Sequence, residues 1–298
     1  PYRQALMPIF APKAIRELED KVRGWAAKIV DAAIDNGECD FLHDVASLFP
    51  VSVFMELMGM PLDRLRECRD ISDGFFKAQG EEVLKQSIII NELLMGIIND
   101  KKANPDEGLI SHLLGVQVSG RPITDDEVLN MCFVLFLGGM DTVTNVSAFS
   151  FRELAKRPEL QARLVANPDD IPKFVEEGIR CFGVILNPRV VVDDFEKFGV
   201  PFGAGDMLVN LLPLSGRDDR MNDDPDNFDI DREKKENLTF SSGPHLCVGH
   251  FLARTEIKVL TEEWLKRVPS FRLKAGVKHN YRLGTVIAML NLPLEWDA

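Results

Sequence analysis

The sequence predicts a mainly α-helical fold with a small β-sheet portion, formed by one domain over residues 1–298. Three observations lead to this fold class. Apolar residues recur at three- and four-residue spacing through most of the first half, which is typical of amphipathic helices. A long stretch without proline follows a helix-capping sequence at residue 124. Short valine-rich runs bounded by glycine and proline, which are typical of strands, follow only after residue 188.

The first predicted helix covers 13–36, where Ile15, Leu18, Val22, Trp25 and Ile29 share a face and Asn36-Gly37 ends the pattern. Similar patterns predict helices over 51–58, 65–76 and 81–101. Thr124 and Glu127 form a capping box, and the absence of proline up to Pro158 predicts a single helix. Such a helix of ~30 residues spans ~45 Å at 1.5 Å per residue, so we expect it to cross the core.

A further helix is predicted over 172–181, with Pro172 at a permitted first-turn position. After it, 189–193 and 205–212 are predicted strands, with a turn over 202–205. The segment 251–264 predicts another amphipathic helix, and the tail from 281 to 296 predicts a hairpin. The small sheet therefore follows the helices.

Composition excludes several classes of protein. The formal net charge of -12 argues against nucleic-acid binding, which needs clustered lysine and arginine. Acidic residues concentrate over 217–231, whereas Lys234 and Lys235 form a local basic patch that would suit an acidic partner or be a solvated face. The longest apolar run, 131–140, is shorter than the ~20 residues of a membrane span. We expect a cytoplasmic protein that does not enter a membrane.

The five cysteines are odd in number, widely separated and without a paired CxxC motif, which favours a reducing compartment and no zinc site. Cys247 lies in the sequence FSSGPHLCVGH over 240–250. The glycines leave backbone amides free to point at the sulfur, as in proteins that hold an iron-bound thiolate. Taken alone, a cysteine such as Cys247 is far more often a buried packing residue than a metal ligand.

Two other motifs are ambiguous by themselves. Two adjacent glycines inside the long predicted helix, Gly138 and Gly139, cost roughly 1 kcal/mol each relative to alanine, so something should offset them. Gly138, Asp141, Thr142 and Asn145 are expected to share a face and line a gap in the helix. Close helix packing over the glycines, with Asp141 exposed, is the alternative. Glu177 and Arg180, three residues apart, would ordinarily be a surface ion pair.

The motifs together resemble the cytochrome P-450 family. Phe240-x-x-Gly243-x-x-x-Cys247-x-Gly249, the Gly-Gly-x-Asp-Thr helix and the Glu-x-x-Arg helix occur in that family's order, and the resemblance covers essentially the whole chain. The segments 224–232 and Tyr2-Arg3 also fit. The long-helix motif and the ending at 292–297 are most similar to the bacterial camphor hydroxylases. The family's N-terminal part is absent from this chain, which begins at Pro1, so we expect the sequence to open inside the fold.

The resemblance assigns roles residue by residue. It implies haem b as cofactor, Cys247 as the iron ligand, and Asp141 and Thr142 as the residues that deliver protons to bound dioxygen. It further implies that Glu177, Arg180 and Asn227 form a structural brace, although many relatives have arginine or histidine at the place of Asn227. Asn187 replaces an acidic residue near one propionate. The remaining haem-binding positions are Arg3, Arg189, Phe240, His245 and Gly249, and the expected substrate-lining positions are Val134, Leu137, Gly138, Ile185, Thr285 and Val286.

The implied activity is hydroxylation of an unactivated C–H bond in a small hydrophobic, terpenoid or camphor-like substrate, using O2. Electrons would come from a [2Fe-2S] ferredoxin with its NADH-dependent reductase, docking near Cys247 with Lys234 and Arg3 as contacts. A peroxide-driven haem-thiolate enzyme is one alternative, against which the Asp141-Thr142 pair argues. A haem-binding sensor without catalysis is another.

Overall fold

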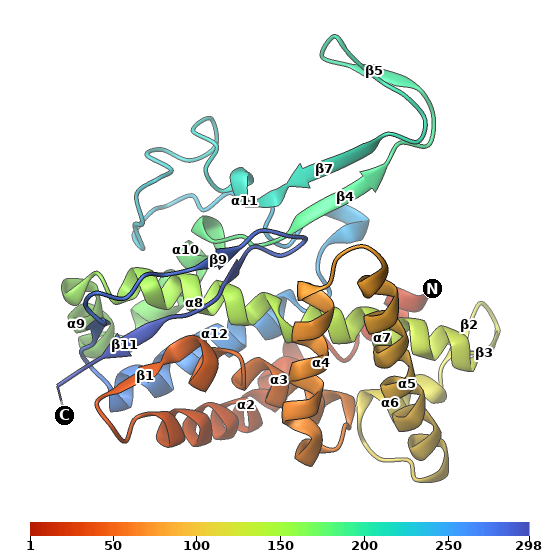
Figure 1. The fold of residues 1–298 in the computed structure, drawn as a ribbon, viewed down its shortest axis with the longest axis horizontal. Coiled ribbons are helices and arrows are strands. Elements are labelled where there is room, and N and C mark those ends of the chain that lie inside the picture. The colour runs from red at the N-terminus through yellow and green to blue at the C-terminus, as the bar shows by residue number, and fades with distance from the viewer. Residues whose placement is uncertain (298) are drawn as a thin grey trace.

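Two long helices, α2 (Pro12–Ala33) and α12 (His250–Arg267), pack against each other along one side of the helical body (Figure 1). The computed structural model describes residues 1–297. Arg23 of α2 ties the two helices together, because its guanidinium donates to Glu262 at 2.6 Å and to Glu263 at 2.9 Å. The partly buried ion pairs reinforce an interface whose centre is apolar.

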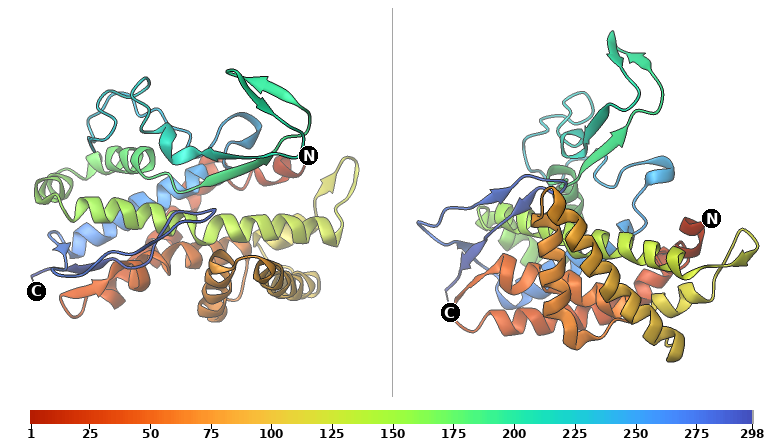
Figure 2. Two further views of the ribbon diagram at one scale, coloured as in Figure 1. Left: turned by 45° about the horizontal axis from the view of Figure 1, so that its top comes forward. Right: turned by 45° about the vertical axis from the view of Figure 1, so that its right-hand side comes forward.

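The other helices follow the amphipathic patterns of the sequence, so the predicted mainly α-helical fold is confirmed. Figure 2 shows α4 and α5 crossing the long central helices on one face. The remaining α-helices are α1 (Tyr2–Leu6), α3 (Phe49–Met58), α4 (Leu65–Lys77), α5 (Glu81–Ala103), α6 (Leu109–Leu114), α9 (Pro158–Ala166), α10 (Ile171–Cys181) and α11 (Leu212–Ser215). Shorter turns of helix are η1 (Leu42–Ala46), η2 (Leu62–Arg64), η3 (Pro168–Asp170) and η4 (Gly243–His245).

The prediction of one unbroken helix after Thr124 was wrong. The capping box is present, with the Glu127 amide donating to Thr124 Oγ1 at 3.3 Å and the Thr124 amide donating to Glu127 Oε2 at 2.8 Å. However, α7 (Asp125–Met140) ends before Asp141, and α8 (Thr142–Leu154) begins after it. The two helices run end to end through the core (Figure 1). Asp141 lies at the break, where its φ of -120° departs from helical geometry.

Within the described residues, the run Asp125–Leu154 is long and apolar enough to span a membrane by composition, and half of its most apolar stretch is buried inside the protein. The core helix of a soluble protein meets the same criteria. The core around it is aromatic: Trp264 of α12 makes edge contacts with Phe41, Phe151 and Phe271.

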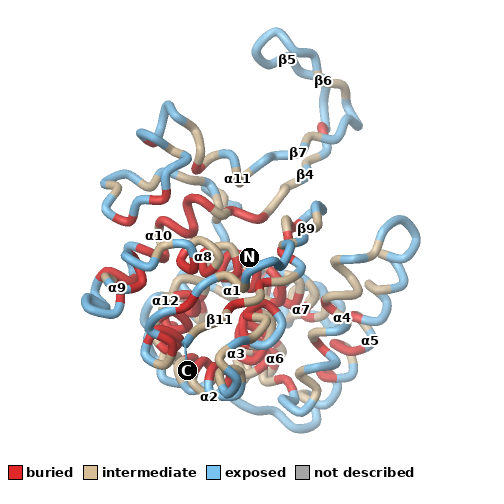
Figure 3. Tube along the Cα trace, turned by 60° about the vertical axis from the view of Figure 1, so that its left-hand side comes forward, coloured by how far each residue is buried: buried red, intermediate tan, exposed pale blue. Residues whose placement is uncertain are grey.

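Short antiparallel strand pairs surround the helices. Strand β4 (Leu186–Val190), which begins three residues before the predicted strand, pairs with β7 (Met207–Leu211). Between them, β5 (Phe195–Lys197) and β6 (Val200–Phe202) form a hairpin that projects from the body and is almost entirely exposed (Figure 3). Two further strands, β2 (Gln117–Val118) and β3 (Arg121–Pro122), pair before α7.

The C-terminal tail is not one hairpin, as the sequence suggested. Strand β9 (Tyr281–Arg282) pairs with β10 (Ala288–Met289), whereas β11 (Pro293–Glu295) joins β1 (Glu38–Asp40) and β8 (Arg272–Leu273) in a separate sheet. A single bridge from Ile185 to Val286 connects the β9–β10 loop to the start of β4. The tail thereby contacts both the strand region and the break between α7 and α8.

Candidate functional site

Cys247 lies at the end of a tight loop that leads directly into α12. The loop reverses through Ser241 and Gly243, which have φ values of 62° and 58°, in the left-handed region. The Cys247 amide donates to the Phe240 carbonyl at 2.8 Å, and this bond closes the loop. The thiol is thereby held one turn before the N-terminus of an 18-residue helix, where the helix dipole favours a negative sulfur.

The surroundings of Cys247 shift the pKa of its thiol in opposite directions. Burial raises the pKa of the Cys247 thiol above its ordinary value, while the Gly249 amide, Arg3 and Arg254 act to lower that pKa. A thiol that coordinates a metal ion is deprotonated outright. The loop therefore provides a sulfur that is stabilised as a thiolate by a backbone donor and two nearby cations once a metal compensates for desolvation.

A cavity of about 260 Å³ separates Cys247 from the helix break. Gly138 and Thr142 line its opposite wall, and His245, Phe240 and Ile185 line it as well. A Cβ placed on Gly138 would meet no heavy atom of the described residues within 4 Å, beyond its immediate neighbours and helix backbone. The absence of a side chain at Gly138 thus leaves space facing the sulfur, which is what a planar cofactor bound through Cys247 requires.

Gly139 has a different role from Gly138. A Cβ on Gly139 would lie 2.4 Å from Cδ2 of Phe54 on α3, so this glycine permits close packing of α7 against α3. The glycine pair therefore divides between the two interpretations, with open space at Gly138 and close helix packing at Gly139. Asp141 is buried, contrary to the packing alternative.

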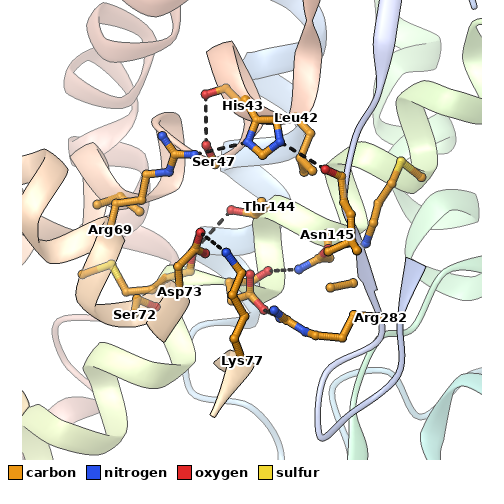
Figure 4. A pocket seen from close by; sticks show the side chains of 16 residues that line it. Leu42, His43, Ser47, Arg69, Ser72, Asp73, Lys77, Thr144, Asn145 and Arg282 are labelled. Carbon is orange, nitrogen blue, oxygen red and sulfur yellow. Dashed lines mark hydrogen bonds and ion pairs between the residues drawn. The ribbon is translucent and has the colours of Figure 1, made fainter. Parts of the chain in front are cut away.

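The polar residues at the break do not share one face as expected. The Thr142 hydroxyl donates to the Gly138 carbonyl at 2.8 Å and lies on the side of Cys247. Asp141 and Asn145 line a separate polar pocket of about 300 Å³ (Figure 4). Asp141 and Thr142 are adjacent in the chain, and adjacent residues do not face the same way even in a regular helix, so their side chains lie on different sides of the break.

Asp141 lies among charged groups in this polar pocket. Its Oδ2 atom lies 3.8 Å from Nη2 of Arg282 on β9. The pKa of Asp141 is raised to about 6, mainly by burial; Arg282 acts against this rise, Asp73 adds to it, and Asn145 and Lys77 act against it. A carboxyl with a pKa close to physiological pH can both take up and release a proton there.

A larger cavity of about 480 Å³ adjoins Gly138 and Thr142 on the side away from Cys247. Phe75 and Phe76 of α4 line it, and Lys77 and Arg282 are the cationic residues in its wall. Most of the predicted substrate-lining positions meet here, namely Leu137, Gly138, Ile185, Thr285 and Val286. Val134 does not: it is 69% exposed and lines another cavity with Tyr2, Arg3 and Val248.

The three residues expected at the haem propionates are dispersed. His245 lines the cavity of Cys247, and Arg3 lies on α1 in the cavity beside Val134. Arg189 is bonded locally: its Nη1 atom donates to the Pro188 carbonyl at 2.8 Å and to Asn187 Oδ1. Asn187 itself lines the cavity of Cys247.

The brace is complete and buried. Arg180 Nη2 donates to Glu177 Oε1 at 2.7 Å, and Arg180 Nη1 donates to the carbonyls of Gly216 and Pro225. Asn227 takes part through its backbone carbonyl, which accepts from Arg180 Nη2 at 3.1 Å. The third side chain is Arg232, whose Nε atom donates to Glu177 Oε1 at 3.3 Å.

Sequence reasoning missed Arg232 and Arg282. Arg232 ends the segment 224–232, and its charge beside an otherwise acidic run was the available signal. Arg282 had no signal in the sequence, because its position beside Asp141 depends on how the tail folds back onto α8.

Comparisons with known proteins agree with this geometry. Residues 51–294 match the family model described as Cytochrome P450. Cytochrome P450(MEG) of Priestia megaterium is 32% identical over 310 residues, which cover 98% of this chain and 75% of that protein. The crystal structures of CYP101J2 and cytochrome P450 CYP101C1 both give a TM-score of 0.91, at 32% and 31% identity. Each covers 100% of this chain, which spans 75% and 76% of theirs.

Proposed function

Since the chain belongs to the cytochrome P450 family, as a haem b monooxygenase that uses O2 and a redox partner, we propose that it hydroxylates an unactivated C–H bond of a small hydrophobic substrate. The substrate class we propose is terpenoid or camphor-like. The size and apolar wall of the cavity beside Thr142 support this class, and so does the resemblance of the segment 138–145 to the camphor hydroxylases. Relatives differ in substrate, since one is named a steroid C26-monooxygenase and another a nocardicin C N-oxygenase.

The observation that carries the proposal is the arrangement of Cys247 opposite Gly138 and Thr142 across one cavity. Cys247 would hold the haem iron, and Phe240, His245, Gly249, Arg3 and Arg189 would support the cofactor. When bound, the haem supplies the oxidising chemistry, and the protein supplies orientation and control of protons. The brace of Glu177, Arg180 and the Asn227 carbonyl would keep the loop before Cys247 in place.

The apolar wall of the larger cavity would orient the substrate. Leu137, Ile185 and Val286 present hydrocarbon surface, so a compact apolar molecule would bind by displacing water from them. Thr142 lies where this cavity meets the cavity of Cys247, and its hydroxyl is therefore placed to hold or pass a proton between them. Asp141 would resupply that proton from the polar pocket.

For the redox partner we propose a [2Fe-2S] ferredoxin with an NADH-dependent reductase. The exposed cations Arg3 and Lys234 suit an acidic docking surface, although the protein as a whole carries a net charge of -12. We further propose that residues 1–298 act as a single haem-binding domain in the cytoplasm, with α7 and α8 as its core helices.

A binding screen on the haem-loaded protein tests the substrate class. Titration with monoterpenoids, norisoprenoids, steroids and fatty acids is expected to convert the haem from low to high spin with the first two classes. Turnover with NADH, reductase and ferredoxin should then give a hydroxylated product. A spin shift restricted to steroids or fatty acids would contradict the substrate class.

Two cysteine variants separate the cofactor assignment from the substrate class. Cys247→Ser should abolish the red-shifted carbonyl Soret band, because the thiolate ligand is lost. The matched control is Cys39→Ser in β1, which does not line the cavity of Cys247, and it should keep that band. An unchanged band in Cys247→Ser would remove Cys247 as the ligand.

A further inference from the structure

Arg282 connects the two cavities on either side of the helix break. It lies on β9, opposite Ala288 of β10, and it lines both the polar pocket of Asp141 and the larger apolar cavity. Its side chain is 21% exposed. A cation in the wall between a proton-carrying carboxyl and the cavity proposed for substrate is not explained by packing, because an aliphatic residue would fill the same space without losing hydration.

Arg282 and Asp141 form an incomplete ion pair. The distance from Arg282 Nη2 to Asp141 Oδ2 is 3.8 Å, which is an ion pair but longer than a hydrogen bond. Asp141 Oδ2 and Arg282 Nε are both buried and have no hydrogen-bond partner among residues 1–297. Each group therefore keeps bonding capacity that a small rotation of either side chain, or a bridging water, would use.

Asn145 fixes the position of the hairpin over the helix break. Its Nδ2 atom donates to the Asp141 carbonyl at 2.8 Å, and its Oδ1 atom accepts from the Met289 amide at 3.0 Å (Figure 4). Both groups bonded by Asn145 are buried backbone groups, so the contact is costly to break. Since Met289 belongs to the strand that pairs with β9, this side chain helps to hold Arg282 beside Asp141.

The other charged groups in the polar pocket have partners of their own. Lys77 Nζ lies 3.2 Å from Asp73 Oδ2, and Arg69 Nη2 lies 3.3 Å from His43 Nδ1. His43 in turn bonds the Leu290 carbonyl through Nε2 at 3.1 Å. Within the described residues, Arg282 is the cation that lies within ion-pair distance of Asp141. The full set of titratable or charged residues lining the pocket is His43, Arg69, Asp73, Lys77, Asp141 and Arg282.

We propose that Arg282 is a positioning residue for Asp141, holding its carboxylate on the polar-pocket side of the helix break, away from Thr142, and so governing its exchange of protons with the haem side. This inference rests on the proposed function. Arg282 touches neither Cys247 nor Thr142 in the structure and acts through Asp141. A proton that Asp141 gives up toward Thr142 is replaced from solvent through the polar pocket.

The carboxyl group of Asp141 gives a direct readout that does not depend on turnover. Side-chain carboxyl groups can be labelled with 13C and titrated by NMR in the diamagnetic ferrous carbonyl form of the holoenzyme, with Asp141→Asn identifying the resonance. In Arg282→Gln, loss of the positive charge should raise the pKa of Asp141 by about 1. In Arg282→Lys, which retains the charge, that pKa should stay close to the wild-type value.

A charge-matched control is available outside the pocket. Arg272→Gln removes the same charge from β8, where Arg272 pairs with Glu295 at 2.9 Å, and it should leave the Asp141 resonance unmoved. Identical titration of Asp141 in Arg282→Gln and wild type would overturn the proposal. An equal shift in Arg282→Gln and Arg282→Lys would also overturn it, because packing rather than charge would then be responsible.

Turnover gives the second readout. As the pH rises, the amount of product formed per NADH consumed is expected to fall. The pH at which this fall occurs should be higher by about 1 in Arg282→Gln and should return to the wild-type value in Arg282→Lys. If the pH profile of product per NADH were the same in Arg282→Gln and wild type, Arg282 would not control the proton exchange of Asp141. Failure of the proposed function can be told apart from failure of the proposal for Arg282. In the first case the wild-type protein would form no product, while the NMR titration would still compare the pKa of Asp141 between the variants.

Discussion

Glu177 and Arg180 are both completely buried on α10, with Arg180 Nη2 2.7 Å from Glu177 Oε1. Arg232 approaches the same Glu177 oxygen at 3.3 Å. Replacing Glu177 by Ala leaves two guanidinium groups without their carboxylate, and we expect the free energy of unfolding to fall by about 3–5 kcal/mol. Urea unfolding of the holoprotein measures this change in the free energy of unfolding. Glu82→Gln breaks an exposed pair with Lys85 and should leave the free energy of unfolding nearly unchanged. Equal effects of the two variants would refute the brace.

The adjacent glycines of α7 should respond oppositely to alanine. Gly139→Ala places a methyl group against Phe54, so we expect a loss of about 1–3 kcal/mol in unfolding free energy. Gly138→Ala meets open space and should gain up to about 1 kcal/mol from helix propensity. Its methyl group also enters the cavity facing Cys247, so the spin-state change on adding substrate should weaken. A destabilised Gly138→Ala would contradict this assignment.

Thr142→Ala should separate electron consumption from product formation. Without the hydroxyl that lies between the two cavities, product per NADH should fall by roughly tenfold or more, with hydrogen peroxide released instead. Thr144→Ala is the matched control, because the Thr144 hydroxyl donates to the Met140 carbonyl and lines the polar pocket. Peroxide and product are measured in the same reaction. Coupling that stays intact in Thr142→Ala would remove Thr142 from proton delivery.

The buried carboxyl of Asp141 predicts a pH dependence of stability. Burial, the largest cause, raises its pKa to about 6 from an ordinary 3.8, so the folded protein holds the proton more tightly than the unfolded chain. Stability from this group is therefore fully present below about pH 4 and is lost as the pH rises to about 6. The loss amounts to about 3 kcal/mol. The unfolding free energy of wild type minus that of Asp141→Asn, measured by urea titration across this range, should show the fall. A flat difference would refute it.

Most of the helices could be predicted from the sequence because their signals are local. The apolar spacing around Val22 and the capping box at Thr124 and Glu127 each depend on residues within two turns of helix. The end of α7 at Met140 could not be predicted in this way. The Thr142 hydroxyl bonds the Gly138 carbonyl, and the Asn145 side chain shares the Asp141 carbonyl with the Asn145 backbone amide. Such contacts with the preceding turn also occur in unbroken helices, so they do not by themselves indicate a helix end.

The residues of the candidate site likewise differ in whether local sequence signals could identify them. Cys247, Glu177 and Arg180 were recognised because their motifs have fixed spacing along the chain. Arg282 was not, since it is placed by a contact between Met289 and Asn145, 144 residues apart. Val134 lines a cavity with Arg3 and Val248, whereas the other predicted substrate positions share a different cavity. Contacts between distant segments carry information that periodicity does not contain.

The loop between β9 and β10 carries Thr285 and Val286 into the larger cavity, and Asn145 fastens the same hairpin to α8. The Leu186 amide also donates to the Thr285 carbonyl at 2.9 Å, which joins the loop to β4. A molecule that displaced this loop on entering the cavity would also displace the strand that carries Arg282, the ion-pair partner of Asp141. Thermodynamic linkage then requires that occupancy of the cavity and the protonation of Asp141 influence each other to the same extent. The C-terminal hairpin therefore connects the wall of the cavity proposed for the substrate with the carboxyl group proposed to supply protons.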